Sequence, residues 1–207
     1  MGHIAIDNSY ATALQALHAP GNPVGFANTY DPSSTAAVLS LNTASTQKVH
    51  TIATASYAIA ASLGIPDEDL SLIQNLDAIS RIAPLVRAAG LPLSADLQDG
   101  YGHHLVEAIQ GAIKLGVVGA NIEDSCPERG HARGMECLRS VEEQVGRIKL
   151  AKRTAADLGV RDFVVNARTD VLRLDPRPEG WTQDMVVEEA VRRGKAFLEA
   201  GATCVFV

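Results

Sequence analysis

Short apolar runs alternate with longer segments of helical periodicity along this chain, and no other feature of the sequence limits its fold as strongly. Apolar residues recur at helical spacing at positions 72, 76, 79 and 82, and again at 141, 145 and 148. We predict six strands at the apolar or β-branched runs 24–28, 49–54, 91–96, 117–123, 163–168 and 203–207. This alternation predicts an α/β protein with a parallel sheet, either open and doubly wound or closed into a barrel.

Charge and cysteine content exclude several classes of protein. A formal net charge of −6 disfavours a nucleic-acid partner or an anionic membrane surface. No apolar stretch approaches the length of a bilayer span. The three cysteines show no CxxC spacing, which argues against a disulfide framework or a zinc knuckle. We therefore expect a cytoplasmic protein with no membrane and no nucleic acid among its partners.

The positions of polar residues favour the barrel over the open sheet. Asn28, Asp96, Glu123 and Arg168 each lie at or just after the carboxyl end of a different predicted strand. In a (β/α)8 TIM-type barrel these ends meet at one mouth, where catalytic groups gather. Neither GxGxxG after the first strand nor GxxxxGK[ST] occurs, so the common nucleotide-binding forms of the open sheet are unsupported. A smaller open α/β fold is the alternative.

The strand count is lower than a complete barrel requires. Barrels of this type have eight strands and about 250 residues, whereas we count six strands, the last of them ending with the sequence at Val207. We therefore expect residues 1–207 to form a single partial barrel domain, truncated after the sixth strand.

Three strand ends carry groups that suit a metal and an oxyanion. Asp96 lies in SADLQDGYG (94–102), Glu123 in NIEDS (121–125) and Arg168 in NARTD (166–170). Mg²⁺ prefers one or two carboxylates and keeps several waters, so this sparse set suits a hard cation that chelates a substrate. Each residue also has a structural interpretation, such as an ion pair between Arg168 and Asp170.

These motifs resemble the phosphoenolpyruvate mutase/isocitrate lyase superfamily. The resemblance spans nearly the whole chain from about Leu17, and its pieces occur in order. The matching segments include LPLSADLQDGYG (91–102), GVVGANIEDS (116–125), VVNARTDV (164–171) and FLEAGATCVFV (197–207). The resemblance implies a (β/α)8 barrel, a homodimer or homotetramer, Mg²⁺ as cofactor, and a small carboxylate or phosphonate substrate.

The resemblance also implies a metal site. Asp96 and Glu123 match acids that help to hold Mg²⁺ in relatives, mostly through water. Gln98 stands where the family has a further acid, and a neutral amide can still coordinate through its oxygen but weakens the site electrostatically.

Other positions match groups that contact the substrate. Arg168 matches the arginine that binds a substrate carboxylate or phosphonate, and Asn121 is a second substrate-binding candidate. Ser56 and Tyr57 match a segment whose backbone N–H groups hold an enolate-like oxygen. Asp67 matches an acid that approaches the substrate in the mutase branch, so we include it, together with Arg168, among the catalytic candidates.

The loop after Glu123 departs from the family pattern. Lyases of the family carry K-K-C-G-H, whereas this chain reads C-P-E-R-G-H over residues 126–131. Arg129 takes the place of the cysteine when the loop is anchored on Gly-His. Anchored on Glu123, Arg129 falls where the mutases have a lysine and His131 where they have an asparagine. Both are catalytic candidates, and Cys126 is an alternative acid.

The function implied by the resemblance is a Mg²⁺-dependent enzyme. It would cleave or rearrange a C–C or P–C bond next to an α-oxo or α-hydroxy carboxylate, through a pyruvate-enolate-like intermediate. Gln98 and the lost loop cysteine motivate the alternative, a catalytically silent barrel retained for ligand binding or assembly.

Overall fold

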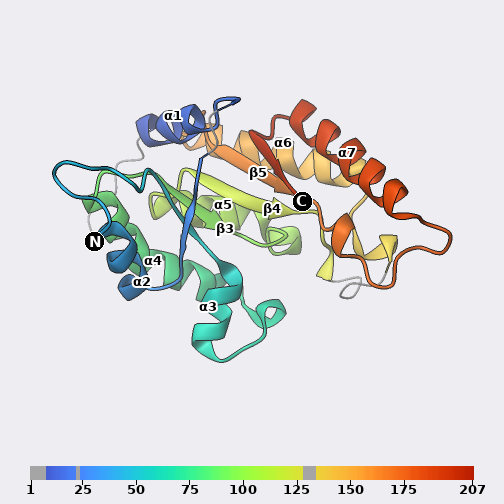
Figure 1. Ribbon diagram of the computed structural model, residues 1–207, viewed down its shortest axis with the longest axis horizontal. Helices are drawn as coiled ribbons and strands as arrows, with labels where there is room; N and C mark the ends of the chain where they lie inside the picture. The colour runs from blue at the N-terminus through green and yellow to red at the C-terminus, as the bar shows by residue number, and fades with distance from the viewer. Residues whose placement is uncertain (1–7, 22–23, 128–133) are drawn as a thin grey trace.

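Six parallel strands lie side by side in chain order in the computed structural model, which describes residues 8–21, 24–127 and 134–207 (Figure 1). The strands are β1 (Ala27–Thr29), β2 (Ile52–Thr54), β3 (Leu93–Asp96), β4 (Gly119–Glu123), β5 (Val164–Arg168) and β6 (Cys204–Phe206). All six predicted strands are confirmed, although each is shorter than the run that predicted it. Among the described residues β1 and β6 are the outer strands of the sheet, and the barrel is not closed.

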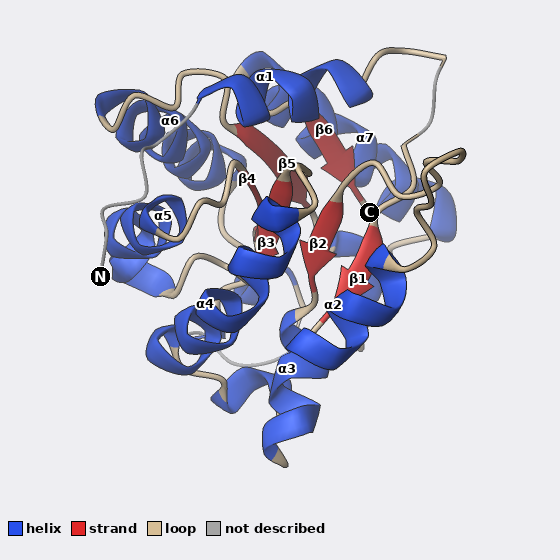
Figure 2. Cartoon of the chain, turned by 90° about the vertical axis from the view of Figure 1, so that its left-hand side faces the viewer, coloured by secondary structure: helices blue, strands red, loops and turns tan. Residues whose placement is uncertain are grey.

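Helices alternate with the strands and pack around the curved sheet (Figure 2). They are α1 (Asn8–Leu17), α2 (Pro32–Leu39), α3 (Ser56–Leu63), α4 (Leu72–Ala88), α5 (Leu105–Lys114), α6 (Val141–Asp157) and α7 (Gln183–Glu199). Neighbouring helices α4, α5, α6 and α7 contact one another in that order, as the outer ring of a TIM-type barrel does. No helix in the described ranges has the length and apolar character needed to cross a membrane.

Local sequence signals explain where the longest helices begin. Ser71 and Gln74 form a capping box at the start of α4, and Ser140 and Glu143 form another at the start of α6. Each box satisfies backbone N–H groups that have no partner within the helix. The apolar stripes then face the sheet, so that residues such as Ile79, Ile82 and Ile148 are fully buried. The predicted helical periodicity is therefore confirmed.

Helix α1 packs against the amino ends of the central strands. Its Leu14 is fully buried, and a Cβ placed at Gly119, the first residue of β4, would lie 2.7 Å from Leu14 Cδ2 and 3.0 Å from Val164 Cβ. Gly119 thus allows α1 and β5 to approach β4 closely. Apolar side chains fill this end of the sheet, so the candidate site residues are to be sought at the opposite end.

Substituting two glycines should change the stability of the fold in opposite directions. Gly119→Ala is expected to lower the free energy of unfolding by about 1 to 3 kcal/mol, because the added methyl group overpacks the core. Gly146 is exposed on α6, and an added Cβ there would meet no atom within 4 Å. Gly146→Ala should therefore raise the free energy of unfolding by about 0.4 to 1 kcal/mol. Urea denaturation of both variants checks this. A stabilising Gly119→Ala would contradict the close packing of α1 on β4.

Candidate active site

Polar side chains form two layers at the carboxyl ends of the strands. The lower layer, in strand register from β3 to β6, consists of Asp96, Asn121, Asn166 and Cys204. The upper layer, from β4 to β6, consists of Glu123, Arg168 and Phe206. Because residues two apart on a strand share a face, these layers stack on one another. The structure thus brings Asp96, Glu123 and Arg168 to the same end of the sheet, on three neighbouring strands.

Asp96 is held by the start of helix α3. Its Oδ2 accepts hydrogen bonds from Ser56 N at 3.0 Å and Ser56 Oγ at 2.8 Å, and its Oδ1 accepts one from Gln98 N at 3.3 Å. The Ser56 amide, which we expected to hold an enolate-like oxygen, donates to Asp96 in the structure. Tyr57, the next residue, is 73% exposed. The role of Ser56 and Tyr57 toward a substrate oxygen stays a prediction.

Gln98 directs its side-chain amide nitrogen to Asp67. Its Nε2 donates to the backbone oxygen of Asp67 at 2.7 Å and to Asp67 Oδ1 at 3.0 Å. Its backbone adopts a left-handed φ of 52°, which is uncommon for a residue with a side chain. Within the described part of the chain Gln98 Oε1 accepts no hydrogen bond. That oxygen is the atom through which an amide can bind a cation.

Glu123 lies between a serine and an arginine. Ser125 Oγ donates to Glu123 Oε1 at 2.8 Å, and Arg168 Nη1 lies 2.9 Å from Glu123 Oε2. Arg168 also donates from Nε to Asp170 Oδ1 at 2.7 Å and lies over the ring of Phe206. The structural interpretation of Arg168 as an ion-pair partner of Asp170 is therefore confirmed, and Glu123 shares the same guanidinium.

Among the described residues, carboxylates outnumber guanidinium groups around Glu123. The pKa of Glu123 is raised to about 7, chiefly by burial and also by the charges of Asp170 and Asp96, while Arg168 and the Ser125 hydrogen bond lower it. Within the described residues the half-buried guanidinium of Arg168 thus faces both Glu123 and Asp170. A cation placed among these carboxylates would relieve their repulsion.

A second set of charged residues connects the loops that follow these strands. Asp124 is fully buried; its Oδ1 accepts the Asp170 amide at 2.9 Å and its Oδ2 accepts Arg193 Nη1 at 2.8 Å. Arg139 Nη2 donates to Asp99 Oδ2 at 2.7 Å. Asp99 also accepts hydrogen bonds from amides of the following turn. This set links the loops after β3, β4 and β5 to helix α7.

A cleft of about 260 Å³ opens at this end of the sheet and is lined in part by Asp67, Gln98, Glu123 and Asp170. Asp96 is not one of the residues that line it; its charge acts on Glu123 and Arg168 from the layer below.

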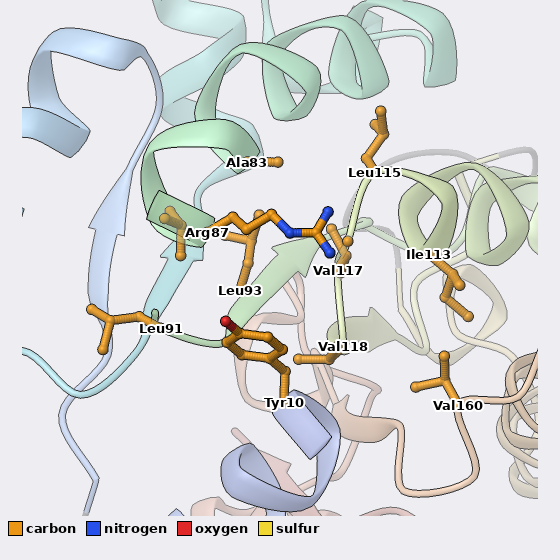
Figure 3. Close-up of a pocket in the computed structure, with 12 residues that line it drawn as sticks. Tyr10, Ala83, Arg87, Leu91, Leu93, Ile113, Leu115, Val117, Val118 and Val160 are labelled. Carbon is orange, nitrogen blue, oxygen red and sulfur yellow. The ribbon is translucent and has the colours of Figure 1, made fainter. Parts of the chain in front are cut away.

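A second, smaller cavity lies at the opposite end of the sheet. Figure 3 shows it between α4 and the amino ends of β3 and β4, with Leu93 and Val118 around it and Tyr10 and Arg87 at its edge. Its volume is only about 30 Å³. Its lining, as far as the structure describes it, is mostly apolar and contains no carboxylate, so we place the candidate active site in the cleft.

The residues at the cleft fit a hard divalent cation. No three His, Cys, Asp or Glu side chains form a metal-binding group within the described residues. Two carboxylates, Asp96 and Glu123, and the Gln98 amide oxygen are the sparse, all-oxygen set that Mg²⁺ accepts, since this ion keeps several of its waters. The excess of carboxylates around Glu123 also favours a bound cation. Their role as ligands stays a prediction.

The remaining predicted site residues are Asn121, Arg129 and His131. Asn121 Oδ1 accepts a hydrogen bond from Asn166 Nδ2 at 2.6 Å in the lower layer. Arg129 and His131 lie outside the described residues. Sequence reasoning did not foresee Ser125 as a partner of Glu123 or Arg193 as a partner of Asp124. The short spacing of Ser125 from Glu123 could have indicated the first, but nothing in the sequence indicates the second.

Known proteins with the same fold and order of motifs identify the family. Residues 14–207 match the family model described as phosphoenolpyruvate phosphomutase. The chain is 34% identical to 2,3-dimethylmalate lyase of Eubacterium barkeri over 152 residues, covering 72% of this chain and 47% of that enzyme. The chain thus spans about half the length of the curated relatives it matches.

Solved structures agree with the sequence match. Phosphoenolpyruvate phosphomutase from Streptomyces platensis subsp. rosaceus superimposes with a TM-score of 0.74 at 29% identity, over 94% of this chain and 62% of that one. Phosphonopyruvate hydrolase in complex with oxalate and Mg²⁺ gives 0.76 at 26% identity, over 95% and 61%. The chain therefore belongs to the phosphoenolpyruvate phosphomutase family, within the phosphoenolpyruvate mutase/isocitrate lyase superfamily.

Proposed function

We propose that this chain provides the catalytic cleft of a Mg²⁺-dependent enzyme that cleaves or rearranges a C–C or P–C bond next to an α-oxo or α-hydroxy carboxylate. The observation that carries the proposal is the cluster of Asp96, Glu123 and Arg168 at the carboxyl ends of three adjacent strands, beside a cleft. Relatives described as a lyase and a hydrolase, the latter complexed with oxalate and Mg²⁺, support it.

The cluster divides naturally into a cation side and an anion side. Asp96, Glu123 and the Gln98 oxygen would hold Mg²⁺, which supplies a positive charge that stabilises an enolate-like oxygen. Arg168 is the only guanidinium of the upper layer, and it would bind the substrate carboxylate or phosphonate through paired N–H donors. Asp170 and Glu123 orient this guanidinium from two sides.

The acid that moves a proton is a separate assignment. Asp67 lines the cleft and is positioned by Gln98, so we propose it as a group near the reacting atoms. Arg129 and His131 remain catalytic candidates from the sequence alone. A homodimer or homotetramer is likewise proposed from the family resemblance.

Binding of oxalate should depend on Mg²⁺. Oxalate mimics a pyruvate enolate, so the chain should bind it measurably in calorimetric titrations with Mg²⁺ and not in EDTA. Glu123→Gln should weaken Mg²⁺ binding by about 10- to 100-fold, as expected when a carboxylate that acts through a bound water is lost. If the unaltered, folded chain binds no oxalate with Mg²⁺ present, the silent scaffold becomes the better description.

Turnover gives the second test. The chain should release pyruvate or oxaloacetate from small 2-oxo, 2-hydroxy or phosphono acids in the presence of Mg²⁺, as coupled assays can detect. Asp96→Asn and Glu123→Gln should lower kcat/KM by at least about 100-fold, because each removes a charge that holds the metal. Unchanged turnover in both variants would be incompatible with the proposed site.

A further inference from the structure

Two of the three cysteines oppose each other at the wall of the cleft. An antiparallel bridge pairs Ser125 with Leu138, and the amide of Cys126 donates to the carbonyl oxygen of Cys137 at 2.7 Å. In this pattern Cys126 and Cys137 occupy directly opposite positions, with their side chains on the same face. Both residues line the 260 Å³ cleft, and both are thiols in the structure.

The spacing of this pair suits a disulfide. Cys126 N and Cys137 O make one of the two hydrogen bonds of an antiparallel pair, while Cys137 N donates to Gly134 O. Directly opposed residues of antiparallel strands have Cα atoms about 4.5 to 5.5 Å apart. Disulfides span Cα separations of about 4.4 to 6.8 Å, so Cys126 and Cys137 need no large backbone shift to be joined. They are 1% and 4% exposed and both line the cleft, so a small reagent in the cleft is the kind of oxidant that could reach them.

We propose that Cys126 and Cys137 form a reversible oxidation site, closed as an intramolecular disulfide by a small-molecule disulfide that enters the cleft. One cysteine thiolate attacks the reagent, breaks its S–S bond and releases one thiol. The second cysteine then attacks the protein sulfur of the mixed disulfide and releases the other thiol. Two protein thiols and one reagent disulfide thus become one protein disulfide and two reagent thiols. This inference does not depend on the proposed function.

Cys204 provides an internal control. It lies on β6, where its Sγ is 3.2 Å from Asn166 Oδ1, and burial raises its pKa to about 11. Because the thiolate is the reactive form, Cys204 should stay reduced under conditions that oxidise the pair.

The test is thiol counting on the full chain. After treatment with hydroxyethyl disulfide, alkylation with iodoacetamide in denaturant should label one cysteine instead of three, and dithiothreitol should restore all three. Trypsin cuts after Arg129 and Arg133, between the two cysteines. Mass spectrometry should therefore find the peptides of Cys126 and Cys137 joined to each other, with Cys204 alkylated.

Serine variants make the result specific. In Cys126→Ser and Cys137→Ser the remaining cysteine of the pair has no protein partner, so it should end as a mixed disulfide with the reagent or as a labelled thiol and never in a protein disulfide, whereas Cys204→Ser should still lose two labels. Thermal melts confirm that each variant is folded, and the peptide map of the unaltered chain stands without them. Labelling of all three cysteines, separate mixed disulfides on Cys126 and Cys137, or a link that includes Cys204 would overturn the proposal.

Discussion

Replacing Arg193 by glutamine should lower the free energy of unfolding by about 3 to 5 kcal/mol, the usual cost of removing one partner of a buried ion pair. The Arg193 side chain is 3% exposed and the Asp124 side chain is fully buried. Arg193 Nη1 donates to Asp124 Oδ2 at 2.8 Å and to the Arg139 carbonyl oxygen at 2.9 Å, and Arg193 Nε donates to Glu189. Glutamine carries no charge, so Asp124 would lose its buried ion-pair partner and keep only neutral donors such as the Asp170 amide. Urea denaturation measures the loss.

Arg192 is the matched control. It neighbours Arg193 on α7 and also donates to Glu189, at 2.7 Å from both Nε and Nη2. Its side chain, however, is 59% exposed, so Arg192→Gln should change stability by at most about 1 kcal/mol. Equal losses in the two variants would show that contact with Glu189, and not the buried pair with Asp124, stabilises this part of the fold.

These adjacent arginines illustrate what a single sequence leaves open. Helical periodicity places Arg193, and not Arg192, on the apolar face with Val186 and Phe197, but it does not show which acid the buried guanidinium meets. Asp124, the deciding partner, lies 69 positions earlier in the chain. Long-range pairing of this kind depends on how α7 packs against the loop after β4, and no local pattern encodes that.

The order of elements and the location of the site were predictable for a physical reason. Strands and helices have different periods of burial, and parallel strands place all their carboxyl ends on one edge. Glu123 and Arg168 therefore meet because each ends a strand and the two strands are neighbours. Their hydrogen bonds were less predictable. The side chain of Gln98 turns to Asp67 from a left-handed backbone, and the Ser56 amide is used by Asp96.

Replacing Arg168 by glutamine should separate anion binding from cation binding. Arg168 is the guanidinium that would pair with the carboxylates of oxalate, so its loss should weaken Mg²⁺-dependent oxalate binding by at least about 30-fold, or 2 kcal/mol. The same change removes the partner that now lies 2.9 Å from Glu123 Oε2. Without that partner the Glu123 carboxylate could help to hold a cation, so Mg²⁺ alone should bind more tightly. Calorimetry of the two ligands measures both effects.

Arg173, which lines the cleft itself, tests whether anion binding needs the half-buried guanidinium of Arg168 or only a positive charge at the cleft. It lies 3.7 Å from the same oxygen of Asp170 that Arg168 contacts, but its side chain is 71% exposed, against 18% for Arg168. Because water screens an exposed charge, Arg173→Gln should change either affinity by less than about fivefold. A loss of oxalate binding as large as that of Arg168→Gln would mean that general positive potential, and not the guanidinium between Glu123 and Asp170, attracts the anion. If Arg168→Gln weakens Mg²⁺ binding as well, Glu123 does not serve the cation, and the division of the cluster into two sides is wrong.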